Sequence, residues 1–161
     1  PLLIIQTMVR FETKAKLQSH GSAALTNLAC RNGRNKALVG QLGGIKAVQS
    51  AMRNFPGNSD LQLNGCRALL NFAVNCANAK VIADSHGIEM LLSAMKIHCD
   101  NADIQHAGCK AIVNMDRAGV FGIKSAILKA KGQREIEQAA KEHTNHPGVK
   151  EYACRVLRIL S

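Results

Sequence analysis

The sequence predicts an all-α solenoid, in which short helical units stack side by side along one axis. The first observation is a phrase that returns at intervals of 44, 43 and 45 residues and begins at Leu17, Leu61, Ile104 and Val149. A second phrase keeps the same register, as GGIKAVQSAMRNF from Gly43 and HGIEMLLSAMKIH from His86. Aromatic residues make up only 3% of the 161 residues, which suits thin, closely packed helices. A fixed period of this length is typical of helical repeats that share one continuous core.

Each unit is expected to contain three helices, and the pattern is clearest around residue 60. The breaker-rich stretch FPGNS precedes a long helix predicted over Asp60–Cys76, with Asp60 as its N-cap. Gly65, Leu69, Phe72 and Cys76 recur at helical spacing and should form one buried stripe. The polar stripe of the same helix consists of Asn64, Arg67, Asn71 and Asn75.

Two shorter helices should follow each long one. Glycine marks the break between them, because it can adopt the left-handed conformation that often ends a helix. We therefore expect helices over Arg34–Leu42, Ile45–Phe55, Ala79–Ser85 and Ile88–His98, and a further long helix over Asp103–Met115. His98 and His143 recur one unit apart and should pack at helix ends rather than bind metal.

Glycine also recurs inside the long helices, at Gly21, Gly65 and Gly108. A glycine in a helix interior costs about 1 kcal/mol relative to alanine. Its return at one register therefore predicts a close helix contact that a methyl group would crowd.

The third unit departs from the period. It holds two more residues between Asn114 and His143 than the previous unit holds between Asn71 and His98. We expect Asp116–Lys131 to absorb this insertion. The units are taken as 1–16, 17–60, 61–103, 104–148 and 149–161 of a single domain, with 1–16 and 149–161 partial, and they are numbered from the first full unit, 17–60. The chain is accordingly expected to belong to a longer array or complex.

Six cysteines occur, but no CxxC pair and no zinc-finger spacing. Cys66, Cys109 and Cys154 share one register, which Ser22 occupies in the first unit. Small residues at one helical position predict packing, so these three should be buried free thiols. Free thiols indicate a reducing, intracellular and cytoplasmic setting, and nuclear or cytoskeletal association would be compatible with it.

The chain carries a net charge of +10, with 21 basic and 11 acidic residues. Such an excess favours acidic partners, whether nucleic acid, an anionic membrane surface or an acidic protein segment. No apolar run approaches the roughly 20 residues of a membrane span. No catalytic motif is present, so we expect neither an enzyme nor a cofactor or metal site.

The units resemble armadillo repeats. NLACRNGRNKALVGQLGGIKAVQSAM, from Asn27, is similar to the repeats of the catenins. AMRNFPGNSDLQLNGCRALLNFA, from Ala51, is similar to the armadillo units of large leucine-rich-repeat kinases and of protist repeat proteins. The resemblance implies a right-handed superhelix of three-helix units, in which the third helices line a concave groove.

In that family an asparagine of the third helix often holds the backbone of an extended peptide, and the resemblance places this role on Asn27, Asn71 and Asn114. The fourth repeat has Ile159 there. Nuclear-import receptors also carry a tryptophan four residues earlier, where this chain has Ala23 and three cations, so a basic ligand is not expected. The predicted groove residues are Asn27, Arg31, Asn64, Arg67, Asn71, Asn75, Lys110, Asn114 and Arg155.

The sequence therefore predicts a protein-binding scaffold whose basic, asparagine-lined groove takes an extended acidic or phosphorylated segment. Two alternatives stay open. The chain could be an architectural subunit of a large assembly with an empty groove, or it could bind nucleic acid through its basic surface. Single-strand readers stack bases on aromatic side chains, and Tyr152 is the only aromatic residue near the predicted groove face.

Overall fold

The computed structural model describes all residues from Pro1 to Ser161 and contains eleven α-helices and no strand. The all-α prediction is confirmed. No helix is both long enough and apolar enough to span a membrane. The helices are α1 Leu2–Arg10, α2 Ala15–Ala29, α3 Gly33–Gln41, α4 Gly44–Asn54, α5 Ser59–Phe72, α6 Cys76–Asp84, α7 Gly87–Ile97, α8 Ala102–Arg117, α9 Ile123–Lys129, α10 Gln133–Glu142 and α11 Pro147–Leu160.

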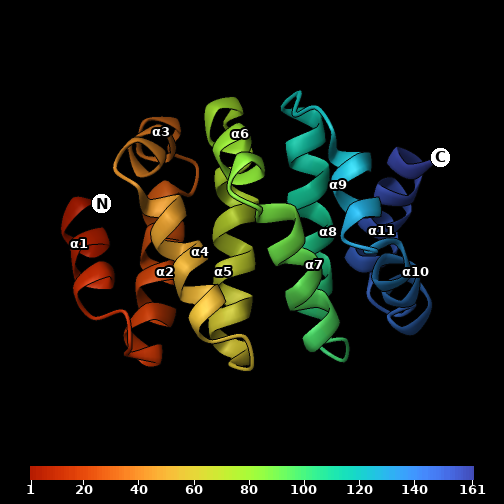
Figure 1. Cartoon of the computed structure of the whole chain (residues 1–161), viewed down its shortest axis with the longest axis horizontal. Helices are drawn as coiled ribbons and strands as arrows, with labels where there is room; N and C mark the ends of the chain where they lie inside the picture. Colours follow the sequence, from red (N-terminus) through yellow and green to blue (C-terminus); the bar gives the residue numbers. More distant parts are fainter.

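The helices form an elongated row with the two termini at opposite ends (Figure 1). The recurring sequence phrase falls on α2, α5, α8 and α11, which we call the long helices; each packs against the next. A second layer consists of α1, α4, α7 and α10, which pack on α2, α5, α8 and α11 respectively. One continuous core of 37 buried apolar residues runs between the layers. The sequence repeat thus corresponds to a repeated arrangement of packed helices.

The glycines of the long helices lie directly against methionines. A Cβ atom at Gly21 would lie 2.6 Å from Met8 Cγ, and one at Gly65 would lie 2.5 Å from Met52 Cγ. The expected close contact is confirmed, and methionine is its partner. On the last two helices, α10 and α11, the same two registers carry Ala140 and Ala153. A large–small pair is replaced there by two residues of intermediate size.

A buried glutamine joins the two layers in each of the first three units. Gln18, Gln62 and Gln105 are each only 2% exposed. Each donates from Nε2 to two carbonyls at the end of the preceding helix. Gln62, for example, bonds to Met52 O at 2.7 Å and to Phe55 O at 3.0 Å. These carbonyls lie in the last turn or at the C-cap, and the glutamine fixes the angle at which the chain enters the long helix.

The two recurring histidines also lie at helix ends, as expected. His98 Nε2 lies 2.8 Å from Pro56 O, and His143 Nε2 lies 2.7 Å from Cys99 O. Each pairs with a carbonyl of the preceding connection, so they tie one unit to the next.

The predicted bounds of the long helix were wrong at both ends. Helix α5 begins after Asn58, whose side chain accepts a hydrogen bond from Leu61 N, and Asp60 lies in the first turn. The helix ends at Phe72 because Asn75 caps the next helix and accepts from Asn78 N. Cys76 therefore begins α6 and is exposed rather than buried.

The cysteine prediction was correct at two positions and wrong at the third. Cys66 and Cys109 are buried between neighbouring long helices, and burial raises the pKa of each thiol to about 12. Cys154 stands at the same register on α11 but is exposed, because no helix packs on that face of the last helix in the row.

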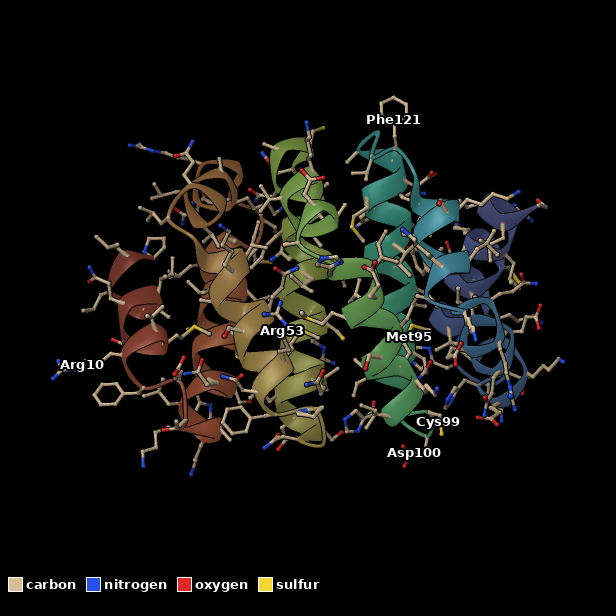
Figure 2. The ribbon with its side chains drawn as sticks, in the orientation of Figure 1. Arg10, Arg53, Met95, Cys99, Asp100 and Phe121 are labelled. Carbon is tan, nitrogen blue, oxygen red and sulfur yellow. The ribbon has the colours of Figure 1, made fainter.

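The third unit deviates within the expected segment. Helix α8 continues to Arg117, the connection Ala118–Gly122 follows, and α9 has only seven residues where α3 and α6 have nine. Gly119 and Gly122 adopt positive φ values of 78° and 79°, and Phe121 projects from the connection between them (Figure 2).

The glycine–methionine contact can be tested by a double-mutant cycle. Gly108→Ala should lower the free energy of unfolding by about 1–3 kcal/mol, because the new methyl group meets Met95. In a Met95→Ala background the same change should be neutral or stabilising by up to about 1 kcal/mol, since alanine is the better helix former. Urea unfolding of the four proteins measures both effects, and Gly57→Ala, which meets no atom within 4 Å, is the control. Equal costs in the two backgrounds would contradict the packing argument.

Thiol labelling should separate the six cysteines into two classes. Cys30, Cys76, Cys99 and Cys154 are exposed and should react rapidly in the native protein at neutral pH. Cys66 and Cys109 should react only after unfolding, because they are buried and remain protonated. Mass spectrometry after brief labelling identifies the sites, and Cys154→Ser should remove one rapid site. Rapid modification of Cys109 would show that the α8–α11 contact opens readily.

Candidate functional site

The predicted groove residues lie mainly on the long helices, at two registers. Asn27, Asn71 and Asn114 occupy one register on α2, α5 and α8. Arg67, Lys110 and Arg155 occupy the other, one turn earlier in the repeat, on α5, α8 and α11. We call the surface that carries these six residues the long-helix face.

Two of the asparagines already bind the protein's own backbone. Asn71 Nδ2 donates to Thr26 O at 2.9 Å, and Asn114 Nδ2 donates to Leu70 O at 3.1 Å. Thr26 O is free to accept because α2 ends three residues later and the amide of Cys30 bonds to Asn27 O instead. The amide groups therefore join neighbouring long helices, and their Oδ1 atoms make no hydrogen bond within the chain.

Asn27 differs from its two counterparts. It is exposed, and its side chain makes no hydrogen bond within the chain. Asn27 can offer its whole amide group to a ligand, whereas Asn71 and Asn114 each use one of their two N–H donors within the protein.

The three other predicted groove residues lie outside the two registers of the long-helix face. Asn64 Nδ2 donates to Ser19 Oγ at 2.9 Å and so joins α5 to α2. Asn75 lies beyond the end of α5, where it caps α6. Arg31 follows α2 in the connection to α3, is exposed, and has a positive φ of 53°. The predicted polar stripe is thus continuous only from Asn64 to Asn71.

The three cations of the long-helix face are held by neighbours. Arg67 Nη2 lies 3.2 Å from Asp103 Oδ2, with both side chains about half exposed. Lys110 Nζ lies 5.0 Å from the centre of the Tyr152 ring, and Arg155 Cζ lies 5.4 Å from it. Arg155 also pairs with Glu151 at 2.8 Å. The ring of Tyr152 therefore makes a cation–π contact with each of the two cations.

Two histidines complete this group and were not predicted as site residues. The ring of His106 lies 5.5 Å from those of His146 and Tyr152. We call Lys110, Arg155, Tyr152, His106 and His146 the α8–α11 cluster. His106 takes the place of Leu63 and Ser19 in earlier units, so periodicity gave no signal for it.

The surroundings of His106 disfavour its protonated form. Burial of the ring is the largest factor that lowers its pKa below the usual 6.5, followed by the positive charge of Lys110. His146 and Arg67 act in the same direction, and the carboxylate of Asp103 opposes them. Asp103 also lies 4.0 Å from His146 Nε2. The cluster can gain positive charge when the pH falls, and a bound anion would favour that gain.

Comparison with known proteins yields no match among family models, curated proteins or solved structures.

Stability should respond to pH through His106. Because its folded pKa lies below its unfolded value, the unfolded chain binds the proton more tightly and stability falls as the pH drops below about 6.5. His106→Leu, which introduces the residue found at position 63, should remove this loss. Urea unfolding at pH 7.5 and 5.5 measures the difference between the two proteins.

The matched control is His20→Leu, at an exposed position of α2. The free energy of unfolding of the His106 variant, relative to that of the wild-type protein, should rise as the pH falls. The same difference for the His20 control should rise less. If the two variants respond equally to pH, the proposed electrostatic surroundings of His106 are wrong.

Proposed function

We propose that the chain is an armadillo-like repeat scaffold that binds an extended acidic or phosphorylated protein segment along the long-helix face. The observation that carries the proposal is the α8–α11 cluster, in which Lys110 and Arg155 are held over one tyrosine ring. Arginine and lysine bind carboxylate and phosphate oxygens through charge-assisted hydrogen bonds. Holding both cations in place before a ligand arrives reduces the conformational entropy lost on binding.

The asparagine register supports an extended ligand. Neighbouring packed helices lie roughly 8–10 Å apart, so four long helices cover about 27 Å from first to last. An extended chain advances about 3.3 Å per residue, so about eight residues would fit. Asn27 would offer a donor and an acceptor to the ligand backbone, and the Oδ1 atoms of Asn71 and Asn114 would accept from its amides.

The architectural alternative has an observation in its favour. The amide groups of Asn71 and Asn114 hold neighbouring long helices together, which is sufficient reason for asparagine at that register without any ligand. Under this alternative, replacement of Asn71 would reduce stability and no peptide would bind the face.

The test compares peptides of eight residues that are labelled with fluorescein and differ in charge. An acidic peptide rich in glutamate should bind the wild-type protein, and a neutral peptide should bind more weakly. Lys110→Glu combined with Arg155→Glu should weaken the acidic peptide at least about tenfold at low salt, since both contacts become repulsive. The loss should shrink as salt increases. Fluorescence anisotropy measures the affinities.

The matched control is Lys129→Glu combined with Arg134→Glu, which makes the same charge change at exposed positions of α9 and α10. Its affinity should stay within about twofold of wild type. Equal losses in both double variants would mean that net charge alone attracts the peptide. A single-stranded oligonucleotide that displaces the peptide at equal concentration would favour the nucleic-acid alternative.

A further inference from the structure

The row of short helices is interrupted in the third unit. Helix α3 packs against α6, and Asn78 Nδ2 joins them through a hydrogen bond of 2.8 Å to Lys36 O. Helix α9 should continue this row, but it packs instead against α7, α8 and α11. Helix α6 still contacts α8 of the third unit, but no short helix packs on it there as α6 itself packs on α3.

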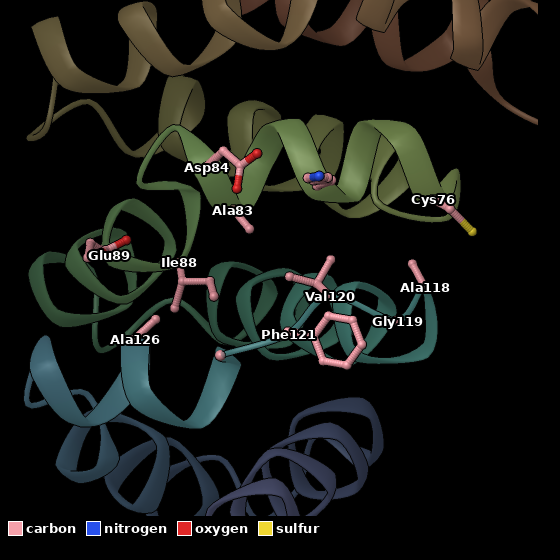
Figure 3. A pocket seen from close by; sticks show the side chains of 12 residues that line it. Cys76, Ala83, Asp84, Ile88, Glu89, Ala118, Gly119, Val120, Phe121 and Ala126 are labelled. Carbon is pink, nitrogen blue, oxygen red and sulfur yellow. The ribbon is translucent and has the colours of Figure 1, made fainter.

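A cleft of about 390 Å³ occupies this position. Ala83 and Asp84 of α6 line one side, and Val120 and Phe121 of the α8–α9 connection line the other (Figure 3). Ala126 of α9 and Ile88 of α7 also contribute, so most of the lining is apolar. The volume lies at the lower end of the range of ligand pockets, about 300–1,000 Å³.

Phe121 stands at the rim of the cleft and is 99% exposed. The positive φ angles of Gly119 and Gly122 direct the connection outward, and glycine adopts them without strain. A bulky aromatic side chain left fully in water is unfavourable, and aromatic residues are frequent anchors of protein interfaces. The cleft therefore combines an apolar floor with an unburied aromatic residue.

The charge of the cleft differs from that of the whole chain. Asp84 and Glu89 contribute two carboxylates, and Lys80 is the only cation in the lining. Glu89 lies 3.6 Å from the exposed ring of His86, which carries charge only when protonated. At neutral pH the lining has a net negative charge on a protein whose formal charge is +10. A partner segment must therefore complement both apolar surface and carboxylates.

We infer that this cleft, which we call the α6–α9 cleft, docks a short segment of another protein that carries a bulky apolar side chain beside lysine or arginine. The apolar side chain lies on Ala83, Val120 and Ile88, and Phe121 closes over it. The cation pairs with Asp84 or Glu89. The site selects a charge opposite to that of the ligand proposed for the long-helix face, so the two surfaces serve different partners.

The test uses two fluorescein-labelled peptides of ten residues that both contain leucine and phenylalanine. One carries four arginines, and the other carries four glutamates in their place. The arginine peptide should bind the wild-type protein, and Phe121→Ser should weaken it about tenfold. Asp84→Lys should also weaken it about tenfold and reduce the salt dependence of its affinity, because one charge contact is lost. The glutamate peptide should be insensitive to both changes.

The matched controls change the same chemistry elsewhere. Leu28→Ser removes an exposed apolar side chain from α2, and Asp100→Lys reverses an exposed charge between α7 and α8. Both should leave the affinity for the arginine peptide within about twofold of wild type, and circular dichroism should show all four variants folded.

No binding of the arginine peptide, or equal losses in variants and controls, would overturn the proposal. So would self-association that depends on Phe121, since the occupant would then be a second copy. Because the cleft and the long-helix face share no residue, failure here leaves the proposed function unaffected.

Discussion

The arrangement of the helices depends on hydrogen-bond donors for backbone carbonyls at helix ends. Eleven short helices leave many such carbonyls without an intrahelical partner, and burying them unpaired would be costly. Gln62 and its counterparts supply such donors between layers, and Asn71 supplies one between units. Asn78 and His98 add contacts between units, to a carbonyl within α3 and to one in the α4–α5 connection. Among buried side-chain nitrogen and oxygen atoms, only Glu135 Oε2 lacks a partner. Polar side chains thus fix the spacing that apolar packing alone would leave adjustable.

This constraint also limits what the long-helix face can offer. Asn71 and Asn114 each use one amide N–H to join neighbouring long helices, so mainly their Oδ1 acceptors remain for a ligand, with cations one turn away. A strand-like backbone with outward amides and acidic side chains complements that pattern. Within the face, Arg67 is paired with Asp103 and Arg155 with Glu151, whereas Lys110 lies against a neutral ring and has no carboxylate partner.

The sequence predicted most of the fold because helical period and repeat period are both local patterns. It predicted the recurring glycine contact and the histidines at helix ends. It misplaced the end of α5, since Asn75 fits a polar stripe as well as an N-cap. Lys110 and Arg155 of the α8–α11 cluster were predicted, but their grouping with His106 and Tyr152 was not, because those two residues interrupt the repeat and meet only through the contact between two helices. The α6–α9 cleft likewise depends on where α9 packs, which an insertion of two residues does not specify.

The exchange from methionine and glycine to two alanines bears on how such arrays can be recombined. The two members of each pair lie on successive helices, as Met95 and Gly108 do on α7 and α8. A crossover between those helices would pair Met95 with Ala153, and the two side chains together would be too large for the contact. The reciprocal product would pair Ala140 with Gly108, and those two would leave the contact underfilled. A crossover within a long helix, after the glycine register, would keep each pair intact. The natural module for shuffling or design is therefore offset from the sequence repeat, with its borders inside the long helices.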